Sequence, residues 1–280
     1  MSILNDVIQQ VQQHNANFIE EIRKKRGNPI IPLFVDPINR STVDNIFNMI
    51  KSPDFTKRRE DCINPDNIDV IIDSGGGDAD AAYHIAKLIH KNFKGQITYI
   101  VPRFAKSAAT LLVCGGNCIM MGPTSELGPL DPQIQQESGE YISAKSVQST
   151  LELIKRYIKE DLELATVIAS RINPLVLGQY ESTLKIAKEY QKELLFLRMF
   201  EKNPKNNKIV SNIVKKFAEG YTHHGRVIDY EEASGSLLRI DFCDSDDWAP
   251  IWKLYMSHTQ IIYLMKVMRI LERARELQID

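Results

Sequence analysis

The sequence predicts an α/β protein with a parallel sheet, followed by a mainly helical second half. Three short apolar runs, at 68–72, 96–101 and 117–122, are typical of strands buried on both faces. A helix with an apolar face is expected at 79–91 between the first two, and a helix of small residues at 108–113 between the last two. Strand–helix–strand alternation at this spacing indicates βαβ units with right-handed crossovers.

Two helices, a strand and a loop are expected before this region. Residues 3–25 have the periodicity of an amphipathic helix, and 29–35 form a strand that Pro32 makes irregular or confines to a sheet edge. Another helix is expected to start near Ser41. The polar, turn-rich segment 52–67 is expected to be a loop.

The second half of the chain has mainly helical patterns. One helix is predicted for 146–169 and another for 182–200, and the segment 203–207 is predicted to be a linker or loop. Mixed helix and a short strand are expected for 208–241. The tail, 248–277, is helical and apolar on more than one face, so it must be buried by its own core or by a second subunit.

Composition excludes some classes of function. The net charge is −1 with both signs mixed along the chain, so no basic stripe marks a nucleic-acid partner. The N-terminal residues lack the basic start and apolar core of a signal peptide. The longest uncharged run, 107–125, contains glycines and a proline that suit a turn and not an integral membrane segment. We therefore expect a soluble, cytoplasmic protein.

The four cysteines favour free thiols over a metal site. Only Cys114 and Cys118 are close in sequence, and their C-x3-C spacing lacks a second pair of ligands. Buried thiols in a reducing compartment are the simpler interpretation. We expect no metal and no cofactor.

The stretch "DSGGGD" (73–78) follows the first strand of the predicted βαβ region, where ligands bind in parallel sheets. Three glycines permit positive φ and a close approach of the backbone to a ligand. They lead into a helix N-terminus, which favours negative charge. The pattern does not match the nucleotide-binding glycine motifs. An oxyanion hole and a simple tight turn are the two interpretations.

The stretch "PRFAKSAAT" (102–110) places Ser107 after the second strand, at the start of a helix of small residues. Ser107 could be a helix N-cap, which this position favours. It could also be a nucleophile at the mouth of the sheet, with the amide of Ala108 beside it as an oxyanion donor. The glycine loop one strand earlier favours the nucleophile.

Together, "IIDSGGGDADAAYHIAKLI" and "PRFAKSAATLLVCGGNCIMMGPTSELGPLDPQ" resemble the Clp protease/crotonase superfold. Within it they are similar to the serine-peptidase branch that includes signal peptide peptidase A, and to the serine dehydrogenase proteinase family. The resemblance covers 68–133, with a weaker match at 224–233. It implies a spiral of βαβ units with a parallel sheet and a helical C-terminal extension. It also implies that Ser107 is the nucleophile and that the amides of Gly76 and Ala108 form the oxyanion hole.

The resemblance also implies a domain organisation. An N-terminal helix (1–26) precedes a Clp/crotonase-like serine peptidase domain (27–242), which contains a helical insertion at about 143–203. A C-terminal helix (243–280) follows, and we expect it to contact other subunits, because families with this fold form oligomers.

A serine nucleophile needs a base, and the sequence offers more than one. The Clp branch uses a histidine soon after the third strand, but no histidine lies between His90 and His223. The signal peptide peptidase branch uses a lysine. Lys106 adjoins Ser107 in sequence and would point away from it, so we expect a structural charge there. Lys145 is placed like the lysine of archaeal membrane-protein-specific relatives, and Lys155 is a lesser candidate. A lysine base requires burial or a nearby cation to lower its pKa.

Histidine remains an alternative base. His223 or His224 could form a dyad with the nucleophile, oriented by Asp229 or Asp241.

Two acidic residues follow the third strand, in the segment "SELGPLDP". Glu126 and Asp131 could bind a metal or orient a base, although their context favours a role in shaping the loop and in oligomer contacts.

These observations predict a homo-oligomeric serine peptidase that acts on peptide or protein substrates. The general base is Lys145 in this prediction. One rival is a crotonase-type acyl-CoA enzyme, which would use the same oxyanion hole without a serine nucleophile. The other is a catalytically silent scaffold that keeps the fold and binds peptides or partners.

Overall fold

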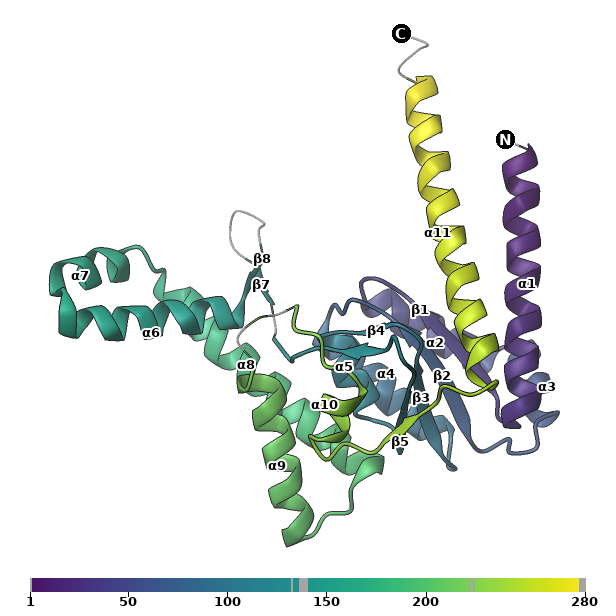
Figure 1. Ribbon diagram of the computed structural model, residues 1–280, viewed down its shortest axis with the longest axis horizontal. Coiled ribbons are helices and arrows are strands. Elements are labelled where there is room, and N and C mark those ends of the chain that lie inside the picture. Colours follow the sequence, from purple (N-terminus) through teal and green to yellow (C-terminus); the bar gives the residue numbers. More distant parts are fainter. Residues whose placement is uncertain (1, 132, 136–140, 222, 224, 277–280) are drawn as a thin grey trace.

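The computed structural model describes residues 2–131, 133–135, 141–221, 223 and 225–276, and its centre is a five-stranded parallel sheet (Figure 1). The strand order is β1-β2-β3-β5-β9, which confirms the predicted α/β class with a parallel sheet. Two smaller sheets pair β4 with β6 and β7 with β8. The strands are β1 (Ile30–Phe34), β2 (Ile68–Asp73), β3 (Ile97–Val101), β4 (Phe104–Ala105), β5 (Cys118–Met121), β6 (Glu126–Leu127), β7 (Gln133–Gln135), β8 (Tyr141–Ser143) and β9 (Ile240–Phe242).

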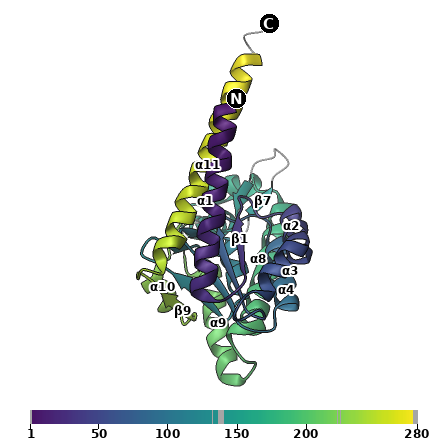
Figure 2. The ribbon, with the colours of Figure 1, turned by 90° about the vertical axis from the view of Figure 1, so that its right-hand side faces the viewer.

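Helices cover both faces of the sheet and extend away from it at two places (Figures 1 and 2). A π-helical turn, Leu195–Met199, follows α8. The helices are α1 (Ser2–Arg26), α2 (Arg40–Lys51), α3 (Pro53–Glu60), α4 (Ala79–Asn92), α5 (Ala108–Val113), α6 (Ala144–Glu160), α7 (Leu162–Ser170), α8 (Pro174–Leu194), α9 (Pro204–Glu219), α10 (Tyr230–Ser234) and α11 (Trp248–Glu276). None of these described helices is long and apolar enough to cross a membrane.

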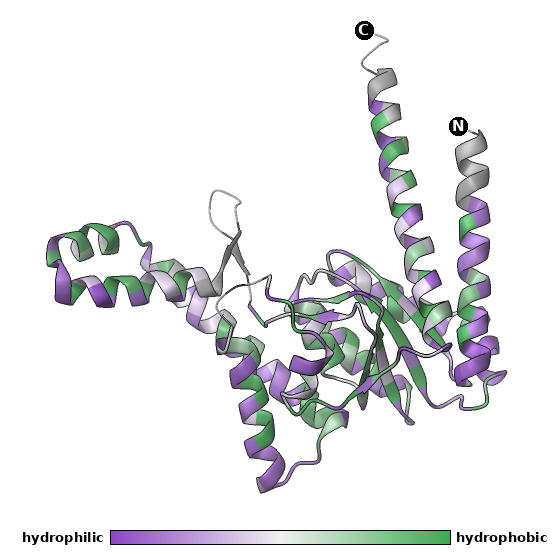
Figure 3. Ribbon diagram, in the orientation of Figure 1, coloured by the Kyte–Doolittle hydropathy of each residue, from purple (hydrophilic) through white to green (hydrophobic). Residues whose placement is uncertain are grey.

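The sheet separates two apolar clusters, and alternate residues of each strand belong to different clusters. In β2, Val70 and Ile72 join the larger cluster with α2, α4 and α5, whereas Ile71 faces α1 and α11. This burial on both faces explains why the strands are continuous apolar runs, coloured as hydrophobic in Figure 3. Strand β1 lies at the edge of the sheet and contains Pro32, as predicted.

The register of the strands sets the position of the functional loops. Ile71 of β2 is paired with Ile100 of β3, so the carboxyl ends of these two strands lie at the same edge of the sheet. The glycine loop leaves β2 there, and the segment that leads to Ser107 leaves β3. Parallel pairing therefore brings together two loops that are about 30 residues apart in the sequence.

Several helix boundaries differ from the prediction. The expected loop at 52–67 contains α3, and α8 and α9 also begin earlier than expected. In all three helices a capping residue precedes a proline in the first turn: the side chains of Ser52, Asn173 and Asn203 accept hydrogen bonds from backbone amides of the helices. Proline fits this position because its missing N–H would have no partner there. The expected single helix at 146–169 is also interrupted, at Asp161, which caps α7.

The base of α1 is fastened to the sheet by a buried ion pair. Asp69 of β2 is fully buried, and its carboxylate accepts hydrogen bonds from the Arg26 guanidinium, with Nε 2.5 Å from Oδ2. The side-chain amide of Asn28 donates to the same oxygen at 3.2 Å. Ionised Asp69 requires these partners at its buried position, because burying an unpaired charge raises the free energy of the folded state.

We predict that Arg26→Ala lowers the free energy of unfolding by on the order of 3 kcal/mol, because it leaves the Asp69 carboxylate buried and without its cation. The control is Lys25→Ala, which removes exposed pairs with Glu21 and Asp247 and should cost at most about 1 kcal/mol. Urea unfolding monitored by circular dichroism measures both. Equal losses in the two variants would contradict this account of the ion pair.

Candidate active site

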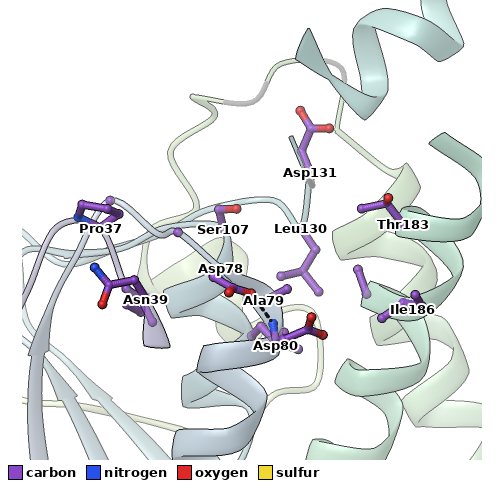
Figure 4. A pocket seen from close by; sticks show the side chains of 16 residues that line it. Pro37, Asn39, Asp78, Ala79, Asp80, Ser107, Leu130, Asp131, Thr183 and Ile186 are labelled. Atoms are coloured by element: carbon purple, nitrogen blue, oxygen red, sulfur yellow. Dashed lines mark hydrogen bonds between the residues drawn. The ribbon is translucent and has the colours of Figure 1, made fainter. Parts of the chain in front are cut away.

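Ser107 occupies a strained turn between β4 and α5. Its φ of 50° and ψ of −115° lie in a region that residues other than glycine rarely adopt. It stands at the N-cap position of α5, but its side chain makes no capping hydrogen bond. Ser107 is therefore an N-cap by position only, and its hydroxyl does not cap the helix. The side chain instead lines a cavity (Figure 4).

The glycine loop touches this turn. Gly76 has a φ of +119°, and a Cβ atom built on it would lie 2.9 Å from the Ser107 Cβ and 2.9 Å from the Lys106 carbonyl oxygen. Gly77 has a φ of +140°, and a Cβ there would lie 2.2 Å from the Ile38 carbonyl oxygen. Both positions therefore require glycine, for conformation and for space. The predicted meeting of the glycine loop and the serine is confirmed.

Backbone hydrogen bonds fix the two loops relative to each other. The Ser74 amide donates to the Phe104 carbonyl at 3.0 Å, and the Lys106 amide donates to the Ser74 carbonyl at 3.0 Å. The Gly76 amide donates to the Ser74 hydroxyl at 3.1 Å. By contrast, the amides of Gly77 and Ala108 have no acceptor in the part of the chain that the structure describes, and both residues line the cavity.

Thr110 ties α5 to the loop that follows β6. Its buried hydroxyl donates to the carbonyls of Ala105 and Gly128 and accepts a hydrogen bond from the Gly128 amide at 3.1 Å. The threonine therefore holds the helix after Ser107 against the segment that leads to Asp131. The sequence alone did not single out this residue, because a threonine in a run of small residues carries no pattern of its own.

The cavity beside Ser107 has a volume of about 640 Å³. In Figure 4, Ser107 lies between the segment bearing Pro37 and Asn39 and helix α8, which contributes Thr183 and Ile186. The lining combines apolar side chains with carboxylates. The apolar ones are Ile38, Ala108, Leu111, Leu130, Ile186 and Ala187, and the acidic ones are Asp78, Asp80 and Asp131.

Helix α8 forms one wall of this cavity and packs against α4 through two tyrosines. The rings of Tyr83 and Tyr190 stack with their centroids 4.1 Å apart. The Tyr190 hydroxyl donates to Asp80 at 2.9 Å, and the Tyr83 hydroxyl donates to Glu193 at 2.5 Å. Sequence reasoning assigned α8 to a helical insertion and did not connect it with the site, since no local motif marks it.

Lys106 has a structural role, as predicted. Its ammonium lies 2.8 Å from Glu126 Oε2 and donates to the Leu127 carbonyl at 3.0 Å. Arg103 donates to the other oxygen of Glu126 at 2.5 Å. Burial opposes ionisation of Glu126, but the two cations outweigh it and lower the pKa of this carboxyl. Glu126 thus anchors the segment that leads into the serine turn.

A second carboxyl, Asp73, ends β2 just before the glycine loop. Its Oδ1 accepts a hydrogen bond from the Phe104 amide at 2.8 Å. Burial raises the pKa of Asp73 to about 6, and the neighbouring Asp36 adds to this rise. No sequence pattern marked Asp73 as a group with a perturbed pKa.

Of the predicted bases, Lys145 lies in the first turn of α6, but its side chain is outside the described part of the structure. One turn later, Gln148 accepts a hydrogen bond from the Tyr180 hydroxyl of α8 at 3.4 Å. Thr183, one turn further along α8, lines the cavity. The start of α6 is therefore close to the α8 wall of the site.

The histidine alternative finds no support in the described residues. His223 is exposed and does not line the cavity, and its Nδ1 accepts a hydrogen bond from the Gly225 amide. His224 is outside the described residues. Asp229 caps α10, and Asp241 lies in β9, so neither is paired with His223. Within the described ranges, no three His, Cys, Asp or Glu side chains are grouped as metal ligands would be.

We predict that Gly76→Ala lowers the free energy of unfolding by several kcal/mol, because alanine at a φ of +119° is strained and its Cβ collides with the serine turn. The control is Gly178→Ala in α8, where a Cβ meets nothing within 4 Å; it should raise stability by roughly 0.5–1 kcal/mol. Chemical denaturation measures both. A Gly76→Ala protein as stable as the parent would contradict the close contact.

Comparison with known proteins extends these observations. The model of the ClpP-like SDH-type serine proteinase family matches residues 4–239. An uncharacterised protein of Methanocaldococcus jannaschii is 32% identical over 114 residues, which cover 41% of this chain and 37% of that protein. Another from the same organism is 26% identical over 188 residues, which cover 67% of this chain and 58% of that protein. The matches thus span well under two thirds of both relatives.

Matches to solved structures extend over most of this chain. A mutant of the 1510-N membrane-bound stomatin-specific protease has 17% sequence identity and a TM-score of 0.47, over 79% of this chain and 82% of its own. The ClpP catalytic domain from Plasmodium falciparum has 14% identity and a TM-score of 0.43, over 84% and 92%. Similarity at this level does not extend to substrates or residue roles. The family model, which covers most of the sequence, is decisive: the chain belongs to the ClpP-like SDH-type serine proteinases.

Proposed function

We propose that the protein is a serine peptidase in which Ser107 attacks a peptide carbonyl carbon. The observation that carries the proposal is the strained turn at Ser107, whose side chain makes no capping bond and lines a cavity. Strain of this kind persists only where surrounding contacts impose it, and it is common at active sites. Membership of a serine proteinase family supports the same reaction type.

The oxyanion that forms in this attack needs backbone donors. The amide of Ala108 adjoins the nucleophile and lacks an acceptor among the described residues. The family resemblance implied Gly76 as the second donor, but its amide already donates to the Ser74 hydroxyl. We therefore propose Gly77 as the second donor, since its amide lacks such an acceptor and it lines the cavity. The role of Gly76 would then be steric: because it has no side chain, the glycine loop and the serine turn can come into contact.

Lys145 is the proposed general base. As a neutral amine it would take the proton of the Ser107 hydroxyl during attack and give it to the departing amine. A water molecule would then hydrolyse the acyl-enzyme, with the same amine as base. The position of the first turn of α6 beside the α8 wall supports this choice.

The substrate class follows from the lining of the cavity. Its apolar wall, which includes Leu111, Leu130 and Ile186, would accept an apolar side chain of a peptide or protein. The acidic groups Asp78 and Asp80 would favour basic neighbours in the substrate. The chemistry requires no cofactor. We further propose that residues 27–242 act as the peptidase domain and that the protein is cytoplasmic.

Two other functions compete with this proposal, although no specific contact favours either. A crotonase-type acyl-CoA enzyme would leave Ser107 without a covalent role. A silent scaffold would bind peptides in the cavity without cleaving them. Covalent labelling of the serine distinguishes the peptidase from both.

We expect a fluorophosphonate probe to label the wild-type protein, because the probe reacts with activated serines. Ser107→Ala should abolish labelling and lower hydrolysis of unfolded casein by at least about 1000-fold. The control is Ser182→Ala, which removes an exposed hydroxyl of α8 and should change neither. Mass spectrometry of the labelled peptide locates the adduct. A folded wild type that neither labels nor cleaves would support the scaffold.

We expect Lys145→Ala to slow labelling and hydrolysis by about 100- to 10,000-fold, the range typical for loss of a general base. The wild-type rate should rise with pH as the amine loses its proton, and the variant should lose this rise. Lys155→Ala, at an exposed lysine of the same helix, is the matched control and should behave like the parent. A large loss in His223→Ala or His224→Ala, with Lys145→Ala active, would assign the base to histidine.

A further inference from the structure

Asp73, the last residue of β2, binds the segment that precedes the nucleophile. Its Oδ1 atom accepts a hydrogen bond from the Phe104 amide at 2.8 Å. The Phe104 carbonyl accepts one from the amide of Ser74, the next residue of the glycine loop, at 3.0 Å. Two consecutive residues thus bind both backbone polar groups of Phe104, which lies three residues before Ser107.

The hydrogen bond to Asp73 differs in kind from the others at this contact. Ser74 and Ala105 form a parallel bridge, and the Lys106 amide donates to the Ser74 carbonyl at 3.0 Å. These bonds join backbone groups, whose charge does not change with pH. A carboxyl can gain or lose a proton, and a hydrogen bond to its ionised form is roughly twice as strong as one between neutral groups. The bond from Phe104 to Asp73 therefore depends on a proton.

The serine turn needs contacts of this kind. Ser107 has a φ of 50°, and a residue other than glycine keeps such a conformation only while its surroundings prevent it from relaxing. When a contact in the preceding segment weakens, a larger share of the molecules relaxes. The strength of the bond from Phe104 to Asp73 is thereby coupled to the fraction of molecules in which Ser107 is correctly placed.

The ionised Asp73 carboxylate lowers the stability of the fold. Its side chain is half-buried, and burial raises the pKa of Asp73 to about 6, although the Phe104 amide and Arg103 oppose this rise. The folded state therefore favours the neutral form. The stability that the proton contributes is complete below the ordinary pKa of 3.8 and is lost as the pH rises through about 6. A charge retained at neutral pH at a cost in stability is typical of groups that serve function.

Ionisable groups on neighbouring elements act on Asp73. Asp36 lies in the loop after β1, and its negative charge adds to the rise in the pKa of Asp73. Arg103, just before β4, has the opposite effect. The same arginine stacks over the ring of Phe104, with its Cζ atom 4.5 Å from the ring centroid.

Helix α11 contributes two further groups. Burial and the charge of Asp73 raise the pKa of Tyr255, so this phenol stays protonated in neutral and acidic solution. His258 stacks on the ring of Phe34 in β1, with centroids 4.5 Å apart, and burial lowers its pKa. His258 is therefore a second group that can change its charge in mildly acidic solution, and an experiment must separate it from Asp73.

We propose that Asp73 is a positioning residue whose ionised carboxylate, through Phe104, keeps Ser107 in its strained turn. Uptake of a proton by Asp73 weakens this hold and lowers the rate at which the serine attacks. Asp73 is not among the residues that line the cavity, so it acts through the chain and not on the substrate. The inference rests on the proposed reaction of Ser107 and adds to it a loss of activity in mildly acidic solution.

The rate of fluorophosphonate labelling, measured from about pH 4.5 to about pH 8.5, tests the proposal. The wild-type rate should include a step with its midpoint near pH 6, in addition to the rise caused by the amine base. Asp73→Asn is neutral at every pH and should lack this step. At about pH 7.5 it should label about 10-fold more slowly, because a charge-assisted hydrogen bond becomes a neutral one. At about pH 5 the two rates should be equal.

Three further variants identify the group that titrates. Asp36→Asn removes a like charge and should move the midpoint of the step to lower pH. His258→Phe keeps a ring against Phe34 but cannot titrate, and it should leave the step in place. The matched control is Asp44→Asn, at an exposed carboxyl of α2, which should behave like the wild type.

Thermal unfolding distinguishes positioning from a structural role. Asp73→Asn should unfold at a higher temperature than the wild type at about pH 7.5, because it removes a half-buried charge. The difference should disappear toward about pH 4, where Asp73 is itself neutral. A residue needed only for the fold would instead make the variant less stable at both pH values.

Hydrogen exchange of residues 102–107 gives a readout that does not require catalysis. This segment should exchange faster in Asp73→Asn than in the wild type at about pH 7.5, and equally fast at about pH 5. A wild type that shows this difference but is not labelled would contradict the peptidase and support the role of Asp73. Equal exchange at both pH values, or a step near pH 6 that persists in Asp73→Asn, would overturn the proposal.

Discussion

The contact between the glycine loop and the serine turn is the constraint on which the site depends. Gly76 lies so close to Ser107 that a Cβ atom would stand 2.9 Å from the serine's own Cβ. This closeness requires parallel pairing of β2 with β3, which brings the two loops to one edge of the sheet. It also requires backbone angles that only glycine adopts without strain. The strand register and the glycines therefore together position Ser107 at the wall of the cavity.

The other side of the serine turn is held by polar contacts that the surrounding protein shields. Thr110, which follows the turn, joins α5 to the loop after β6, and Glu126 binds the cations of Arg103 and Lys106, which precede the turn. These interactions explain how the chain can keep Ser107 at a positive φ, because a strained residue relaxes unless its neighbours prevent it. Rigid backbone around the serine also keeps nearby amides in fixed positions, as stabilisation of an oxyanion requires.

The sequence predicted the parallel sheet and the meeting of its two loops because strand order and glycine spacing are local patterns. It missed α3 and misplaced the starts of α8 and α9, because Ser-Pro and Asn-Pro pairs occur in turns as well as at helix starts. The α8 wall of the cavity, including Ile186, could not be predicted, since tertiary packing alone brings that helix to the site. The distance from Lys145 to Ser107 likewise depends on how helices pack and not on sequence spacing.

Helix α8 joins two parts of the molecule that sequence reasoning treated separately. Its central part lines the cavity through Thr183 and Ile186, and nearer its C-terminal end the stacked rings of Tyr83 and Tyr190 hold it against α4. At its N-terminal end it carries the extension formed with α6 and α7. Its 21 residues form a rod about 30 Å long. Because the cavity-lining residues Thr183 and Ile186 lie between that extension and the tyrosine pair, any tilt of α8 about the pair would move this wall relative to Ser107.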